Sequence, residues 1–220
     1  MRLTRFLPAL CICALGVACG SSAGSGAPTP KGNPPKAIVL TTAQAKSALI
    51  TVADVPGYEV DPDTPTGDDL TVDDFPPGCA ALEAADKADN SLATGFLEAD
   101  FRKTADGPFA GETISLYPTA ADAAREQAAY LNAFRACPSY VGTGEAKGVR
   151  VKLQINTIQQ YGPGAVSFRV TIAGDAFDGI AAVLGNVVVT ANGFDTPGHP
   201  APDLNVLLTK ALAKLTAAAK

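Results

Sequence analysis

The side chains best suited to do chemistry in this sequence are also its scarcest. The chain contains five Cys and a single His, His199. Nucleophilic catalysis by a thiol or a serine hydroxyl needs a histidine base within hydrogen-bond reach. His199 lies in the segment 196–200, whose prolines and glycine are typical of an exposed loop. We therefore expect no catalytic residue of this kind, and we expect that the chain is not an enzyme.

Cys79 and Cys137 are the two cysteines outside the N-terminal segment. An even pair of thiols in an oxidising compartment favours a structural disulfide. The bridge would close a loop of about 58 residues and, if its effect is mainly on the entropy of the unfolded chain, would contribute about 4 kcal/mol of stability. A redox pair or a catalytic thiol is the alternative, but the chain has no C-x-x-C spacing.

Acidic side chains could serve as metal ligands or as a catalytic pair. Asp is frequent between positions 61 and 74, but Pro65 and Thr66 stand where an EF-hand loop needs Asp or Asn and Gly. We interpret this run as a solvated loop, with a weak cation site as the alternative, and we expect no metal site and no cofactor. Two carboxylates could also hydrolyse a glycoside, but no pair stands out, and the lack of Trp argues against a sugar-stacking groove.

The N-terminus has the pattern of a secretion signal. Arg2 and Arg5 precede an apolar run at 6–15, which small residues follow. This run is typical of a signal peptide and is too short for a permanent membrane span. Cys19 comes next in a setting that resembles a bacterial lipobox, although Gly16 stands where Leu is usual. We predict that Cys19 is acylated, with palmitate among its chains, and holds a lipoprotein at the extracytoplasmic face of the cell membrane. Ordinary cleavage before a chance cysteine is the alternative.

Composition divides the chain into three parts. Residues 1–18 form the signal peptide, and residues 19–36 form the lipidated cysteine and a flexible tether rich in Pro, Gly and Ser. Residues 37–220 form one extracytoplasmic domain, because no further boundary, repeat or apolar span is visible. The whole chain has 17 Lys and Arg against 22 Asp and Glu. It lacks the basic clusters that bind phosphates, so we expect no nucleic-acid partner.

Several segments have the alternation of apolar and polar residues that is typical of strands. They lie around 97–102, 113–117, 149–156 and 166–172, and the apolar run 180–190 suits a central strand. Turn residues at 161–164 and 174–179 separate the last three into a meander. A polar side on each strand indicates a sheet that is covered by helices on one face and wet on the other.

Helices are predicted at 42–50, at 79–88, after Thr119 and from near Pro202 and Asp203. Thr119 is a capping residue, and Asp122 completes a variant of the capping box. Apolar residues recur at helical spacing in the last helix, at Leu204, Leu208 and further on. Together these elements predict an α+β fold, with an antiparallel sheet of about five to six strands packed against helices and one disulfide.

Aromatic side chains could line a pocket, although such residues belong more often to a core. The candidates are Tyr58, Tyr117, Tyr130, Tyr140, Tyr161, Phe96, Phe101 and Phe168. We interpret them mainly as core residues, and the sequence assigns no ligand-binding residue.

Four short segments carry a resemblance to a known family: Ala-Asp-Val-Pro-Gly-Tyr at 53–58, Gly-Cys at 78–79, Phe-Arg-Ala-Cys at 134–137 and Gly-Asp at 174–175. With the lipobox and tether, they resemble actinobacterial surface lipoproteins related to the extracellular sensor domain of PknH-type receptor kinases. The resemblance covers about residues 40–218. It implies an α+β fold with a cleft, usually with two disulfides, whereas this chain has cysteines for one. It implies extracytoplasmic binding, without a known ligand and without a kinase domain here.

We therefore predict a non-enzymatic, membrane-anchored domain that binds a small ligand or another envelope protein. A carrier of lipid or cell-wall precursors is the first alternative, and it needs an apolar cavity between sheet and helices. A hydrolase of envelope polymers is the second alternative. It would need a close pair of acids in a cleft, one of them with a raised pKa.

Overall fold

The computed structural model describes residues 38–62, 76–196 and 200–220. Contacts group Lys36–Lys220 into one unit. In chain order its elements are α1 (Thr42–Ala48), β1 (Glu59–Val60), α2 (Ala80–Leu92), β2 (Gly95–Arg102), β3 (Phe109–Leu116), α3 (Ala120–Ala136), β4 (Ser139–Val141), η1 (Gly144–Ala146), β5 (Arg150–Thr157), η2 (Gln159–Tyr161), β6 (Val166–Ile172), β7 (Asp175–Leu184), β8 (Val187–Phe194) and α4 (Leu204–Ala218). Among these helices, none is long and apolar enough to cross a membrane.

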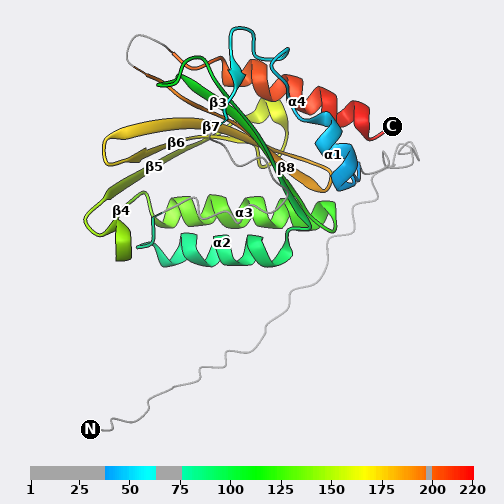
Figure 1. Ribbon diagram of the computed structural model, residues 1–220. Coiled ribbons are helices and arrows are strands. Elements are labelled where there is room, and N and C mark those ends of the chain that lie inside the picture. Colours follow the sequence, from blue (N-terminus) through cyan, green and yellow to red (C-terminus); the bar gives the residue numbers. More distant parts are fainter. Residues whose placement is uncertain (1–37, 63–75, 197–199) are drawn as a thin grey trace, which may run out of the picture. The chain divides into compact units, whose positions relative to one another are not determined.

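The strands form one antiparallel sheet in the order β1-β2-β3-β8-β7-β6-β5-β4. Strands β5 to β8 form a meander, in which each strand pairs with the next. Strand β3 pairs with β8, so β1, β2 and β3 extend this meander at its other side. Figure 1 shows α1 and α4 on one face of the sheet and α2 and α3 on the other.

The larger core lies between the sheet and the helices α1 and α4. It forms because alternate residues of β2, β3, β7 and β8 are apolar and point to this face. Buried side chains of the helices pack on them, including Ala45 of α1 and Leu208 and Leu215 of α4. We expected a stripe of Leu204, Leu208, Ala211 and Leu215 on the last helix, and three of these four are buried, with Leu207 in place of Leu204.

A second core lies on the opposite face, where α2 and α3 cover β5 and β6. Leu82 of α2 and Phe134 of α3 pack against Val151 and Leu153 of β5 and Val170 of β6. The expectation that one face of the sheet is wet is therefore wrong. The error arose because the polar sides of different strands point to opposite faces of the sheet. Those of β2, β3 and β8 face α2 and α3, whereas the polar residues of β5, such as Lys152 and Gln154, are exposed on the other face.

Local side-chain caps explain where the helices begin. Thr41 accepts a hydrogen bond from the backbone N–H of Gln44, whose side chain in turn accepts from the N–H of Thr41. Thr119 caps α3 and Asp203 caps α4 in the same way, through hydrogen bonds from N–H groups of the first turn. Of these capping residues, Thr119 was predicted from the sequence, and the three helices begin at or next to the predicted positions.

The sheet has more strands than the five to six that we expected. Strands β1 and β4 are two and three residues long, which is too short for a periodic pattern. The apolar run 180–190, expected as one strand, instead folds into β7 and β8 around Gly185 and Asn186. The Asn186 side chain accepts from the N–H of Leu40 and donates to the carbonyls of Leu40 and Tyr117, which fixes this turn in the core. Gly-Asn is a hairpin signal that the apolar residues on either side concealed.

Candidate functional site

A cleft of about 570 Å³ lies between α3 and the sheet face opposite α4. Its floor comes from β2, β3, β8, β7 and β6, and α3 with part of α2 supplies the other wall. The volume falls within the range of about 300–1,000 Å³ that small-molecule sites occupy in proteins. This face is polar on one half of the sheet and apolar on the other, and strand register explains the division.

One row of paired residues crosses the floor from an acid to a branched apolar side chain. Glu98 of β2 pairs with Thr113 of β3, and Thr113 pairs with Thr190 of β8. Thr190 then pairs with Ala181 of β7, and Ala181 pairs with Val166 of β6. Paired residues point to the same face. The row therefore changes from a carboxylate through two hydroxyls to apolar groups.

The next row of paired residues also changes from an acid to an apolar side chain, and two of its members are glycines that leave space above the floor. Its members, from β2 to β6, are Asp100, Gly111, Asn192, Gly179 and Phe168. A Cβ at Gly111 would collide with the Asp100 carboxylate, and one at Gly179 would collide with the Phe168 ring. The two glycines thus let an acid from one side and an aromatic ring from the other lie flat over the floor.

Aromatic rings make up the apolar part of the cleft. Phe134 of α3 stacks on Phe168 with ring centroids 5.9 Å apart, and Phe177 of β7 meets Phe168 edge-on at 6.4 Å. Phe109 and Phe194 form a further tilted pair at 6.3 Å. Such pairs present both ring faces and ring edges to a bound molecule.

Buried acids lie where α2 and α3 meet the end of β3. Asp89 of α2 lines the cleft and is only 4% exposed, and Tyr117 donates a hydrogen bond to its Oδ1. Burial raises the pKa of Asp89; the hydrogen bond from Tyr117 opposes this, and the nearby charge of Glu126 adds to it. Glu126 is itself buried, and its Oε2 atom has no hydrogen-bond partner among the described residues. This part of the protein therefore holds two carboxyl groups away from water.

Arg102 lies at the end of β2, next to the cleft, and is engaged by acids of the edge strand. Its Nε lies 3.1 Å from Oε1 of Glu59, and its Nη1 lies 3.5 Å from Oδ1 of Asp61. Asp61 lines the cleft, so this arginine balances one of the carboxylates at the rim. Within the described part of the chain, the lining includes no Lys, Arg or His.

The helix layer above the cleft is held together by a disulfide and a hydrogen bond. Cys79, which precedes α2, is bonded to Cys137, which follows α3, with their Cα atoms 6.3 Å apart. This confirms the predicted disulfide. The hydroxyl of Tyr130 in α3 also donates to Oδ1 of Asp86 in α2 at 2.8 Å. The two helices therefore behave as one support for the cleft wall.

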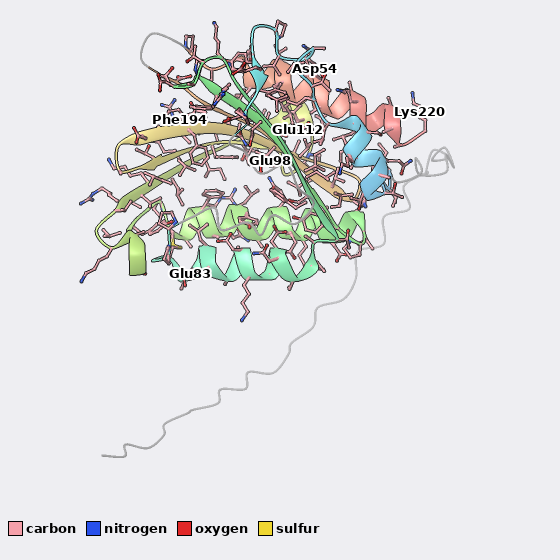
Figure 2. The ribbon with its side chains drawn as sticks, in the orientation of Figure 1. Asp54, Glu83, Glu98, Glu112, Phe194 and Lys220 are labelled. Carbon is pink, nitrogen blue, oxygen red and sulfur yellow. A yellow bond between two sulfur atoms is a disulfide. The ribbon has the colours of Figure 1, made fainter. Side chains whose placement is uncertain are left out.

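A further buried acid, Glu112 of β3, lies on the other face of the sheet from Glu98 (Figure 2). Its Oε2 accepts a 2.7 Å hydrogen bond from the N–H of Ile50, and its Oε1 has no partner within the described segments. Burial raises the pKa of Glu112 to about 7, against smaller opposing effects of the Ile50 hydrogen bond and the Lys214 charge. Glu112 belongs to the core beneath α1 and α4 and does not line the cleft.

The structure sorts the aromatic candidates into two groups. Phe96, Tyr117, Tyr130 and Phe168 line the cleft. Of these, Tyr117 is also buried, and Tyr130 and Phe168 also pack against a core cluster, as the core interpretation expected. Phe101, Tyr58, Tyr161 and Tyr140 belong to or pack against the two cores, as expected. Cys19, His199 and residues 63–74 of the acidic run lie outside the described residues. In the remainder, no group of three or more His, Cys, Asp or Glu is arranged to hold a metal ion.

Sequence reasoning missed the acids and several rings of the cleft. The missed residues are Asp89, Glu98, Asp100, Phe109, Phe177 and Phe194. Glu98 and Asp100 were visible as the polar side of a strand, but that side was assigned to solvent. One feature of the sequence could have indicated them: within one sheet, a strand with acidic residues on one side occurs together with strands that carry aromatic residues.

Comparison with known proteins gives a fold neighbour. No protein-family model matches the chain, and no curated protein matches it. Among solved structures, the extracellular domain of PknH from Mycobacterium tuberculosis aligns with a TM-score of 0.50 and 13% identity. The alignment covers 82% of this chain and 93% of that one. The chain therefore shares the fold of a kinase extracellular domain, as the sequence resemblance implied.

Proposed function

We propose that this protein is a non-enzymatic, sensor-like lipoprotein whose folded domain binds a small ligand in the cleft between the sheet and α3. Acylated Cys19 holds it at the extracytoplasmic face of the cell membrane. The observation that carries the proposal is the cleft itself, a ligand-sized hollow in which aromatic rings and a few polar groups converge. The disulfide fits an oxidising compartment, and the shared fold of a receptor kinase's extracellular domain supports the same location.

The two alternatives fit the cleft less well. A carrier of lipids or cell-wall precursors needs a cavity that is apolar throughout, whereas this cleft has acids on β2 along one side. A hydrolase needs two carboxyl groups that reach one substrate. Asp89 lines the cleft and has a raised pKa, but Glu126, whose charge acts on it, is not part of the lining. The other carboxyl groups of the lining, Glu98 and Asp100, stand on a different element, β2.

Native mass spectrometry of the domain, incubated with an envelope extract, tests ligand binding. Thr190 lies in the middle of the floor, so Thr190→Phe fills the cleft. Thr171→Phe is the matched control, because Thr171 is a strand residue on the opposite face and lies outside the lining. We expect wild type and Thr171→Phe to retain the same added mass and Thr190→Phe to lose it.

Two outcomes of this experiment would contradict binding of a small ligand without turnover. If folded wild-type protein retains no mass from any extract, the small-ligand function is wrong and a protein partner must be sought by cross-linking. If the extract is instead turned over and Asp89→Asn abolishes that turnover, the protein is a hydrolase.

Membrane fractionation with labelled palmitate tests the anchor. Cys19→Ser removes the acceptor thiol, so we expect the label to be lost and the protein to leave the membrane fraction. Cys13→Ser, inside the signal peptide, is the control and should keep both. An unlabelled wild-type protein would contradict lipidation.

A further inference from the structure

We propose that the cleft selects an amphiphilic cation, with an ammonium head group bound by the carboxylates of β2 and an apolar body lying against the aromatic residues of β6, β7 and α3. This inference rests on the proposed function, because it names the chemical class of that ligand.

The gradient sets the direction in which a ligand would lie. Glu98 and Asp100 stand on β2, and Val166 and Phe168 stand at the other ends of the same two rows on β6. Four strand intervals separate the two ends, which at about 4.8 Å each gives a span of about 19 Å. A ligand that fills the cleft across the strands therefore has a polar end and an apolar end.

The charge of the lining sets the sign of the polar end. Asp89, Glu98 and Asp100 all contribute to the surface of the cleft, and no basic side chain does so in the described part of the protein. Arg102, at the end of β2, pairs with Glu59 and Asp61 at the rim. An anionic head group would meet several like charges, whereas an ammonium group would gain both their attraction and that of nearby ring faces.

Buried acids make a positive ligand more favourable still. Asp89 and Glu126 are both almost fully buried, and their charges disfavour each other. Oε2 of Glu126 has no hydrogen-bond donor within the described segments, although Arg125 reaches Oε1 at 3.2 Å. Carboxylates held away from water are costly unless a positive charge lies near them. Glu126 already has Arg125 beside it and lies outside the lining, so a cation in the cleft would supply this charge to Asp89, which lines the cleft.

Three compounds with the same chain and different head groups test the charge selectivity. Decyltrimethylammonium, decanesulfonate and decyl maltoside would be titrated below their micellar concentrations, with isothermal calorimetry and backbone amide NMR as readouts. We expect the cation to bind at least tenfold more tightly than the other two, and to perturb residues of β2, β6 and α3. Its affinity should fall as salt is raised, because charge attraction is screened.

A charge-matched pair of variants then tests which acids are responsible. Glu98→Gln/Asp100→Asn keeps the side-chain size and removes two charges from β2. Asp106→Asn/Asp175→Asn removes two charges outside the lining, one from an exposed turn and one from the exposed first residue of β7. We expect at least a tenfold loss of cation affinity in the first variant and none in the second, with thermal unfolding used to check that both are folded.

The outcomes separate this inference from the proposed function. If the neutral or anionic compound binds as tightly as the cation, or if none of the three binds while the extract still yields a retained mass, the ligand class is wrong and the binding function stands. If wild type binds neither the compounds nor anything in the extract, both are wrong. Selectivity that survives Glu98→Gln/Asp100→Asn would contradict the role of the β2 acids.

Discussion

The hydroxyl of Tyr117 donates a 2.6 Å hydrogen bond to Oδ1 of Asp89, which joins the residue after β3 to helix α2. Both side chains are buried, at 3% and 4% exposure. Tyr117→Phe should destabilise the domain by about 1–3 kcal/mol, because it leaves a buried carboxylate without its donor. In the wild type this hydrogen bond lowers the pKa of Asp89, which means that it stabilises the ionised carboxylate. The loss of folding free energy in Tyr117→Phe should therefore be larger at about pH 8 than at about pH 5. Urea unfolding at the two pH values measures both effects.

A matched control for this variant is Tyr140→Phe. The hydroxyl of Tyr140 is buried but has no hydrogen-bond partner among the described residues. Its removal should leave the free energy of unfolding unchanged or slightly increased, since an unsatisfied polar group is lost. Equal destabilisation by Tyr117→Phe and Tyr140→Phe would show that loss of packing, and not of the hydrogen bond, explains the first result.

Ionisation of Glu112 should make the domain less stable as the pH rises. The ordinary pKa of 4.5 applies to the unfolded chain, and burial raises it to about 7 in the native state. The native state therefore holds this proton more tightly, and its contribution to stability is lost between about pH 4.5 and 7. Glu112→Gln removes the charge and keeps an acceptor for the Ile50 N–H. We expect it to be more stable than wild type at about pH 8, by up to about 3 kcal/mol, with little gain at about pH 4.

Chemical denaturation from about pH 4 to 8 measures this difference. Asp106→Asn, at an exposed turn, is the control and should follow the wild-type curve. Asp89 also has a raised pKa, so the Gln variant keeps part of the downward slope. A pH dependence identical to wild type would mean that Glu112 is ionised in the native state at no cost.

Removing either cysteine, or both, should lower the free energy of unfolding by the same amount, because each change breaks the same disulfide. Cys79→Ser and Cys137→Ser should each lower the free energy of unfolding by about 4 kcal/mol, because either one opens the loop of 58 residues. The double variant should be no less stable than either single variant, and reduced wild type should resemble all three. Additive losses in thermal or urea unfolding would show that the two cysteines contribute independently.

Gly179 should tolerate no side chain while Phe168 crosses above it. A Cβ at this position collides with the Phe168 ring, so Gly179→Ala should cost about 1–3 kcal/mol and displace the ring from the cleft. The same change should cost much less in a Phe168→Ala background, where the space is open. A double-mutant cycle measures the coupling. A cost that does not depend on Phe168 would place the strain in the backbone of β7.

Elements that local interactions define could be predicted from the sequence. Thr41, Thr119 and Asp203 each bond N–H groups a few residues away, so their helices were found with correct starts. Where long-range interactions determine the structure, the sequence-based prediction of the elements was wrong. Asn186 holds its turn by bonding Leu40 and Tyr117, which lie far away in the sequence, and the run around it was taken as one strand.

The sequence predicted the strand that carries the acids of the cleft, but not the position of the cleft in the fold. Glu98 and Asp100 alternate with apolar residues, and this pattern correctly indicated a strand. The residues near Glu98 and Asp100 in the sequence do not show that helix α3 lies over this polar side across the cleft. The position of α3 depends on the disulfide and on its packing against β5 and β6. For the same reason the buried residues of α3 include Glu126 and Gln127, whereas Ala124 and Ala128 are exposed.

The two ends of the folded domain lie together, on the face of the sheet that α4 covers. Figure 1 shows α1 beside the end of α4. The side chain of Gln44 in α1 donates a 2.9 Å hydrogen bond to the carbonyl of Ala218 in α4. A short linker could therefore join the ends, and new termini could be opened at an exposed turn such as 162–164. A fluorescent reporter fused behind α4 would likewise be attached away from the cleft, so that ligand exchange could be followed in living cells without blocking it.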